Sequence, residues 1–135
     1  FQKPHIGVAA LNPHASDAGL LGSEEAVAIK PAIDEANRLG LQVTGPVPAD
    51  TLFTQAINGD YDVVLAMYHD QGHIPIKVHG LERSISINLG LPIIRTSVDH
   101  GTAFDIAGRG VAQSESMTEA IKLAAILASG QGLPR

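Results

Sequence analysis

Short apolar runs alternate along the chain with longer segments in which apolar residues recur every three or four positions. The first run ends at the turn signal Asn12-Pro13, and this layout is typical of a buried strand. Five runs predict extended segments, at residues 6–11, 41–44, 61–67, 84–89 and 91–95. The fourth run alternates polar and apolar residues, so we expect one of its faces to be buried and the other exposed.

Two of the segments between these runs predict helices. After the cap Ser23, apolar residues recur at helical spacing as far as residue 39, and Gly40 marks the end of the helix. Pro31 lies inside this segment, which predicts either a kink or two short helices in series. A shorter helix is expected over residues 51–57, with Asp50 as its cap.

The last helical pattern begins at residues 116–119, Ser-Met-Thr-Glu, which fit a capping box, and it ends at Gly130. Strands that alternate with helices predict an α/β fold with a sheet that is at least partly parallel. With 135 residues, 44% of them hydrophobic, we expect a single α/β domain over residues 1–135. The first strand follows the start of the chain at once, without an initiator methionine, so we expect a fragment of a longer protein.

Composition removes several classes of function. A net charge of -5, with three Phe and two Tyr, provides neither the basic surface nor the stacking aromatics of a nucleic-acid-binding protein. The absence of cysteine excludes disulfides and thiolate metal sites, and it agrees with a cytoplasmic location. No apolar run approaches the roughly 20 residues of a membrane span, and we expect no membrane association.

Titratable side chains follow the first three predicted strands. His14 comes after the first, Asp50 after the second, and His69 with Asp70 after the third. Sites in α/β sheets lie beyond the carboxyl ends of the strands, so these residues are candidates for one site. Two histidines and a carboxylate suit zinc or a similar divalent ion, with the third ligand supplied by one of the two aspartates or by another chain.

The ordinary structural role of a single histidine remains the alternative for each of these positions, and we keep it for the other four histidines: His5, His73, His79 and His100. Of these, His73 is close enough in sequence to His69 to face the same site. Lys77 and Arg95 suit a carboxylate or phosphate ligand, and the alternative is two surface cations. Residues 97–110 form a glycine-rich loop that allows close approach to a ligand.

Four ordered segments carry a resemblance to a known family: LNPHASDAG, GPVPADTLF, MYHDQGHIPIK and LGLPIIRTSVDHGTAFDIAGRG. Together they resemble the carboxyl-terminal part of the 4-hydroxythreonine-4-phosphate dehydrogenases of vitamin B6 biosynthesis. The resemblance implies an α/β/α sheet of the isocitrate and isopropylmalate dehydrogenase type, of which this chain would be the carboxyl-terminal portion. It also implies a larger two-domain dehydrogenase that forms homodimers with an active site built from both subunits.

For the metal, the resemblance makes His14 and His69 two of three histidine ligands of a divalent ion, zinc or alternatively magnesium or cobalt. The third histidine would lie upstream of this chain. Asp50 becomes a polar catalytic member of the site. We expect Asp70 to orient a metal-bound imidazole, and the alternative is that Asp70 is itself a ligand.

For the substrate, the resemblance makes Lys77 and Arg95 substrate contacts. We expect Lys77 to neutralise the carboxylate or to relay a proton, and Arg95 to anchor the phosphate. Ser86 stands where the family typically has a substrate-binding asparagine, and Asn88 lies on the same face of the strand. The segment HGTAFDIAGRG resembles a loop that holds the adenine end of NAD, and this implies that His100, Gly101 and Asp105 bind NAD or NADP.

The implied reaction is the NAD-dependent oxidation and decarboxylation of a phosphorylated hydroxy acid, 4-hydroxythreonine 4-phosphate. The segment DQGHIPIK resembles the branch of the family that acts on D-threonate or D-erythronate 4-phosphate, which is the alternative substrate class. Two further alternatives are a metal-independent phosphate acyltransferase of related fold and an inactive fragment that binds metal or dimerises.

Overall fold

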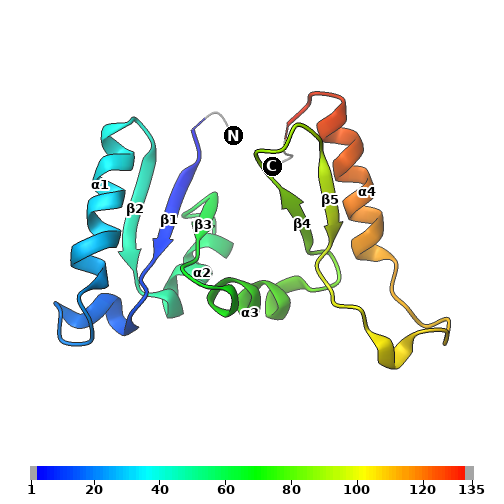
Figure 1. The fold of residues 1–135 in the computed structure, drawn as a ribbon, viewed down its shortest axis with the longest axis horizontal. Coiled ribbons are helices and arrows are strands. Elements are labelled where there is room, and N and C mark those ends of the chain that lie inside the picture. Colours follow the sequence, from blue (N-terminus) through cyan, green and yellow to red (C-terminus); the bar gives the residue numbers. More distant parts are fainter. Residues whose placement is uncertain (1–2, 133–135) are drawn as a thin grey trace. The chain divides into compact units, whose positions relative to one another are not determined.

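Residues 3–132, the part of the chain that this computed structural model describes, form five strands and four α-helices (Figure 1). The chain divides between Pro75 and Ile76 into two compact units. The single domain expected over residues 1–135 stays a prediction, and its first two and last three residues lie outside the described range. No helix among the described residues has the length and apolar character needed to cross a lipid bilayer.

The first unit contains a three-stranded parallel sheet. Strand β1 (His5–Ala9) lies in the middle, with β2 (Gln42–Val47) on one side and β3 (Val63–Leu65) on the other. Ile6 is paired with Val43 in β2 and with Val63 in β3. A parallel sheet in an α/β chain is therefore confirmed.

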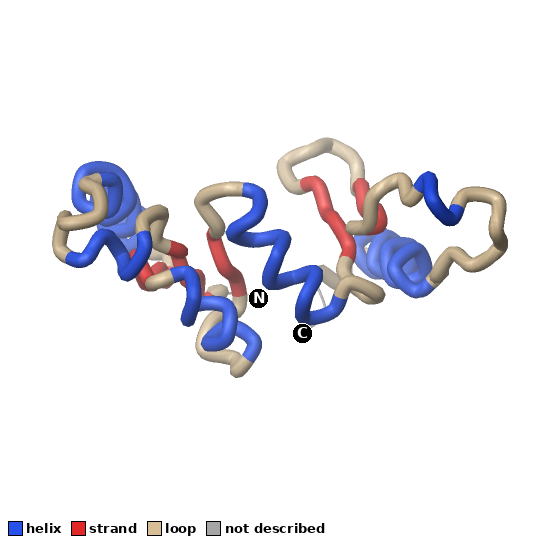
Figure 2. The backbone as a smooth tube through the Cα atoms, turned by 90° about the horizontal axis from the view of Figure 1, so that it is seen from below, coloured by secondary structure: helices blue, strands red, loops and turns tan. Residues whose placement is uncertain are grey.

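Helices cover both faces of this sheet, because neighbouring residues of β1 point to opposite sides. On one face, Val8 packs with Ile29 and Ile33 in a buried cluster at the helix α1 (Lys30–Arg38). On the other, a Cβ atom added to Gly7 would lie 2.7 Å from Cδ1 of Leu52, in helix α2 (Ala49–Ile57). Figure 2 shows α1 and α2 on opposite sides of the strands. The unit is thus layered as helix, sheet, helix.

The first predicted helix is in fact two elements in series. A π-helical segment, η2 (Glu25–Ile29), leads directly into α1, and Pro31 lies at the start of α1. The expectation of two helices in series is confirmed. The expected cap of α2 at Asp50 is wrong, because the carbonyl of Pro48 already accepts hydrogen bonds from the backbone N–H groups of Thr51 and Leu52. Asp50 therefore lies in the first turn of α2.

Helix α3 (His69–Gly80) was missed by the sequence analysis, which expected only a polar segment after the third strand. Gly72 and Pro75 both lie inside it, and these residue types disfavour helix interiors. The residues from His69 onward therefore hold their side chains at helical rather than loop positions.

The second unit contains an antiparallel pair, β4 (Ile85–Asn88) and β5 (Arg95–Val98), packed with helix α4 (Glu115–Ala128). The extended piece predicted at 91–95 is wrong in position, since β5 begins at Arg95 and the preceding residues connect the two strands. The capping box at Ser116 is also wrong. Ser114 occupies the cap position, and the buried Ser116 hydroxyl instead donates to the carbonyl oxygen of Ser84 at 2.7 Å.

Candidate functional site

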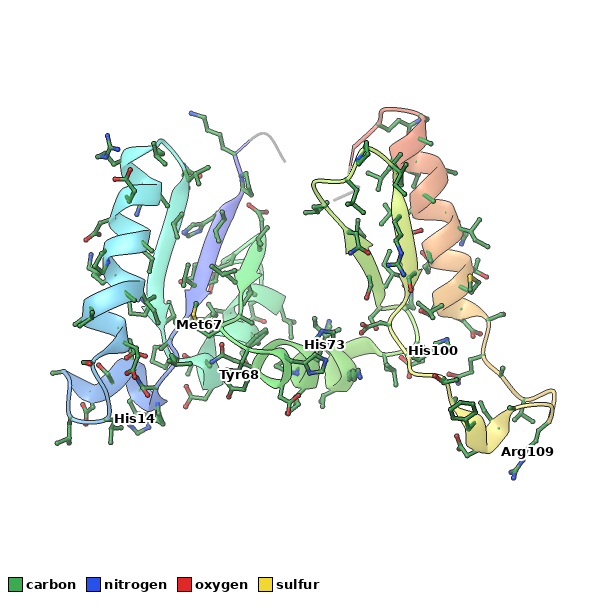
Figure 3. All side chains as sticks on the ribbon, in the orientation of Figure 1. His14, Met67, Tyr68, His73, His100 and Arg109 are labelled. Carbon is green, nitrogen blue, oxygen red and sulfur yellow. The ribbon has the colours of Figure 1, made fainter. Side chains whose placement is uncertain are left out.

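The carboxyl ends of β1, β2 and β3 share one edge of the parallel sheet, and each leads into a candidate residue. The 3-10 segment η1 (Pro13–Asp17) follows β1 and carries His14, α2 follows β2 and carries Asp50, and α3 follows β3 and begins at His69. Figure 3 shows His14, Met67 and Tyr68 at this end of the strands. The predicted placement of these residues beyond strand ends is confirmed.

The backbone around His14 adopts an unusual conformation. Five consecutive residues other than glycine have positive φ angles between 47° and 66°, and they are His14, Ala15, Ser16, Asp17 and Ala18. Left-handed backbone costs roughly 1–2 kcal/mol per residue, so the surrounding structure must hold this turn. The carbonyl oxygen of Ser16 accepts hydrogen bonds from the N–H groups of Gly19 and Leu21. Strain of this kind is concentrated at functional sites in proteins, which favours a functional role for the turn.

A buried carboxylate anchors the start of the same turn. The backbone N–H of Asn12 donates to Oε1 of Glu25 at 2.7 Å, and its side-chain amide donates to Oε2 of Glu25 and to Oε2 of Glu24. Burial raises the pKa of Glu25, but hydrogen bonds outweigh it, those from Asn12 first and those from the backbone of Glu25 and Leu11 after them, so that the pKa is lowered overall. The pKa of Glu24 is lowered, chiefly by its hydrogen bond from the Asn12 side chain. The ionised carboxylates thus hold the segment that leads to His14.

The imidazole of His69 has a defined orientation. Its Nδ1 lies 2.7 Å from Oδ1 of Asp70, and its ring stacks on that of His73 with centroids 4.1 Å apart. An ionised carboxylate only accepts hydrogen bonds, so Nδ1 carries the proton and a neutral ring keeps its lone pair on Nε2. Histidine ligands of metals are typically oriented by a carboxylate in this way. The contact fits the orienting role expected of Asp70.

Gln71 is a buried polar residue to which the sequence alone assigns no role. Its Oε1 accepts a hydrogen bond from the backbone N–H of Met67, and its Nε2 donates to the carbonyl oxygen of Ala10, both at 2.8 Å. The sequence likewise assigns no site role to Asn12 or Glu25. All three form hydrogen bonds to backbone groups or to residues distant in sequence. Such contacts produce no spacing pattern that the sequence alone could reveal.

The donor set fits part of a metal site. Two exposed imidazoles follow neighbouring strands, and one of them has a carboxylate on its Nδ1. In the described part of the chain, no three His, Asp or Glu side chains converge as a metal site. The roles of His14 and His69 as metal ligands, and that of Asp50, which is exposed on α2, therefore stay predictions.

The substrate candidates lie mostly on the polar face of the β4–β5 pair in the second unit. Asn88 is paired with Arg95 across the strands, and Nη1 of Arg95 donates to Oδ1 of Asn88 at 2.5 Å. Ser86 shares this face, as predicted, and its hydroxyl donates to Oδ1 of Asp99 at 3.3 Å. A guanidinium has five N–H donors, so Arg95 retains donors for an anion. Lys77 is exposed on α3.

The glycine-rich loop of the second unit encloses a pocket of about 610 Å³. His100 and Gly101 line it, whereas Asp105 is exposed on the short segment η3 (Phe104–Ile106) and does not. The His100 Nδ1 donates to the carbonyl oxygen of Gly101 at 3.0 Å, which holds the ring against the loop. Figure 3 shows His100 and Arg109 on this loop. Two of the three cofactor candidates, His100 and Gly101, thus line the same pocket.

Comparisons with known proteins agree on one family. The family model described as "Pyridoxal phosphate biosynthetic protein PdxA" matches residues 1–124. The D-threonate 4-phosphate dehydrogenase of Salmonella typhimurium is 57% identical over 128 residues, which cover 95% of this chain and 39% of that protein. The 4-hydroxythreonine-4-phosphate dehydrogenase of Beijerinckia indica is 57% identical over 122 residues, 90% of this chain and 36% of that protein.

A solved structure is also similar. The crystal structure of 4-hydroxythreonine-4-phosphate dehydrogenase from Klebsiella pneumoniae superposes with a TM-score of 0.80 at 54% identity, over 92% of this chain and 38% of that one. The chain therefore spans about two fifths of the length of the relatives that it matches.

Proposed function

The chain belongs to the PdxA family, and we propose that it forms part of the active site of a dehydrogenase that depends on NAD and a divalent metal. The reaction would oxidise and decarboxylate a phosphorylated hydroxy acid. The observation that carries this proposal is the placement of His14 and His69 beyond neighbouring strands of one parallel sheet, with Asp70 bound to Nδ1 of His69.

The substrate that we propose is 4-hydroxythreonine 4-phosphate, and D-threonate 4-phosphate is the second candidate. Both carry a carboxylate, a secondary hydroxyl and a phosphate. Beside the carboxylate, the first has an amino group and the second has a hydroxyl group. Relatives named for each substrate match this chain at the same 57% identity. We keep the second candidate because Ser86 stands where the family resemblance leads us to expect asparagine, and because the segment DQGHIPIK resembles the D-threonate branch of the family.

We propose a separate role for each candidate residue of the two units. Arg95 binds the phosphate through its remaining guanidinium donors, and Asn88 fixes the guanidinium plane. Lys77 neutralises the carboxylate and relays a proton. Neutral His14 and His69 hold the divalent ion, and Asp70 keeps the His69 ring oriented toward it. The ion, zinc or alternatively magnesium or cobalt, would supply Lewis acidity at the substrate hydroxyl and carboxylate.

The nicotinamide cofactor would bind the pocket of the second unit. Glycines at 101, 108 and 110 line this pocket, so the backbone can approach a ligand closely. His100 contributes an aromatic surface beside the Gly101 carbonyl. NAD, or alternatively NADP, would accept the hydride from the substrate. We further propose that two copies of the protein form a homodimer and that the site takes groups from both.

Replacement of His69 by alanine tests the proposal. In the whole dehydrogenase of which this chain would form part, we expect His69→Ala to abolish metal-dependent NADH formation and to weaken zinc binding. The circular dichroism spectrum should stay unchanged, because the side chain is exposed. The matched control is His79→Ala, which removes an exposed histidine from the same helix and should change neither quantity. Normal turnover of the His69→Ala protein would refute the assignment.

A further inference from the structure

The side chain of Gln71 replaces the direct backbone hydrogen bonding that would otherwise continue between the chain segments after β1 and β3. The parallel register pairs Val8 with Leu65, where β3 ends. Continued by two residues, the same register places Ala10 opposite Met67. At that point the amide of Gln71 lies between the strands, with Nε2 on the carbonyl of Ala10 and Oε1 on the N–H of Met67. A side-chain amide therefore joins two backbones that would otherwise pair directly.

The connection extends to the third strand. The backbone N–H of Ala10 donates to the carbonyl oxygen of Val47, the last residue of β2, at 2.8 Å. A continuous series of hydrogen bonds thus runs from Val47 through Ala10 and Gln71 to Met67, across the carboxyl ends of all three strands. Ala10 is 1% exposed and Gln71 8%. Water cannot readily replace these bonds, so their loss leaves buried backbone groups unsatisfied.

We propose that Gln71 is a positioning residue that sets the spacing between the segment bearing His14 and the helix bearing His69. Ala10 lies four residues before His14, and Met67 lies two residues before His69. The amide inserted between them holds the two strand ends apart by the width of one planar group. The part of this inference that concerns metal binding rests on the proposed function. The mechanical part, that the spacing of the two histidines depends on Gln71, does not.

The chemistry at this position requires one donor and one acceptor on the same planar group. In Gln71→Glu the carboxylate can still accept from Met67, but it has no proton for the Ala10 carbonyl. In Gln71→Leu both bonds are lost at similar side-chain volume. Comparison of the two variants therefore separates the hydrogen bond to Met67, after β3, from the hydrogen bond to Ala10, after β1. Gln131→Leu, at an exposed position after α4, is the matched control.

The test compares these proteins by NMR and by zinc titration. We expect the Met67 amide to exchange at least tenfold faster with solvent in Gln71→Leu and at the wild-type rate in Gln71→Glu. The ring-proton shifts of His14 should move in both Gln71 variants, although His14 has no hydrogen bond to Gln71. Zinc affinity should fall about 10- to 100-fold in both. Gln131→Leu should match the wild type throughout.

The His14 shifts test the role of Gln71 separately from the proposed function. If the wild-type protein binds no divalent metal, the proposed function fails, and the His14 shifts in the metal-free variants still decide the role of Gln71. Unchanged His14 shifts in Gln71→Glu would overturn the inference, as would zinc affinity in Gln71→Leu equal to that of the wild type. His14 shifts that move in both variants, with shifts in Gln131→Leu unchanged, would support it.

Discussion

The two units of the chain hold their candidate residues by different physical means. In the first, buried side chains bind backbone groups at the strand ends, as Gln71 does at Ala10 and Met67 and as Glu25 does at Asn12. In the second, Asn88 and Arg95 lie opposite each other at the exposed end of an antiparallel pair, and the register of the strands brings them together. The first arrangement depends on burial, whereas the second depends on strand pairing.

This difference predicts how each unit responds to substitution. A buried polar group that loses its partner costs the full penalty of desolvation, and a buried apolar side chain that is truncated leaves a cavity. An exposed pair loses little, because water replaces the missing group. Substitutions in the first unit should therefore have large effects on the whole site, and those on the strand pair of the second should have small and local effects.

The largest effect is expected from Leu52→Ala. Leu52 is 0% exposed and packs beneath Gly7 in the middle strand of the sheet. Truncation should lower the free energy of unfolding by about 2–5 kcal/mol, through lost burial and the cavity left behind. Urea unfolding measures this change, and hydrogen exchange should locate it in β1. Leu39→Ala, at a position 68% exposed, is the control and should stay within about 0.5 kcal/mol of the wild type. Equal effects at the two positions would contradict the burial argument.

Glu25→Gln should have the next largest effect, and it should depend on pH. Asn12 directs two N–H groups at the carboxylate, and glutamine offers one acceptor and one NH₂ group in its place. We expect a loss of about 1–3 kcal/mol near neutral pH. The folded-state pKa of Glu25 lies below the ordinary value of 4.5, so its stabilisation is present above that value and is lost as pH falls through the folded-state pKa.

The two proteins should therefore converge in stability in acid. Urea unfolding at neutral pH and at a pH below the folded-state value measures the difference. Glu35→Gln is the control. The pKa of Glu35 is also lowered, by its hydrogen bonds from Arg38, but this pair is exposed on α1, so its substitution should change stability much less. A constant difference between Glu25→Gln and the wild type at all pH values would show that the ionised carboxylate is not what anchors Asn12.

The sequence was sufficient for those elements whose pattern is local. Apolar runs bounded by turn residues predicted all three strands of the parallel sheet, and alternation predicted β4 and the shared face of Ser86 and Asn88. The placement of His14 and His69 beyond strand ends followed from the order of elements alone. The boundaries shifted by a few residues, because backbone carbonyls such as that of Pro48 can start a helix before any side-chain cap.

What the sequence could not predict depends on contacts between distant residues or on backbone conformation. Gln71 binds Ala10 across 61 positions, and a lone glutamine in a polar segment has no signal for such a contact. The left-handed turn at His14 contains mostly non-glycine residues, so its composition argues against the conformation it adopts. Helix α3 was missed because Gly72 and Pro75 are poor helix formers and tertiary packing overrides their propensity.

The smallest effect is expected from Thr96→Val, in the second unit. The Thr96 hydroxyl donates to the carbonyl oxygen of Ala120 at 2.8 Å and joins β5 to α4. Valine has nearly the same shape as threonine. The Ala120 carbonyl keeps its helical hydrogen bond from the N–H of Ala124 in α4, so only one hydrogen bond is lost. Urea unfolding should show a loss of about 0.5–1.5 kcal/mol, with Thr118→Val on the exposed face of α4 unchanged. A loss as large as that of Leu52→Ala would mean that the strand pair depends on buried polar contacts as much as the parallel sheet does, and the contrast between the two units would then fail.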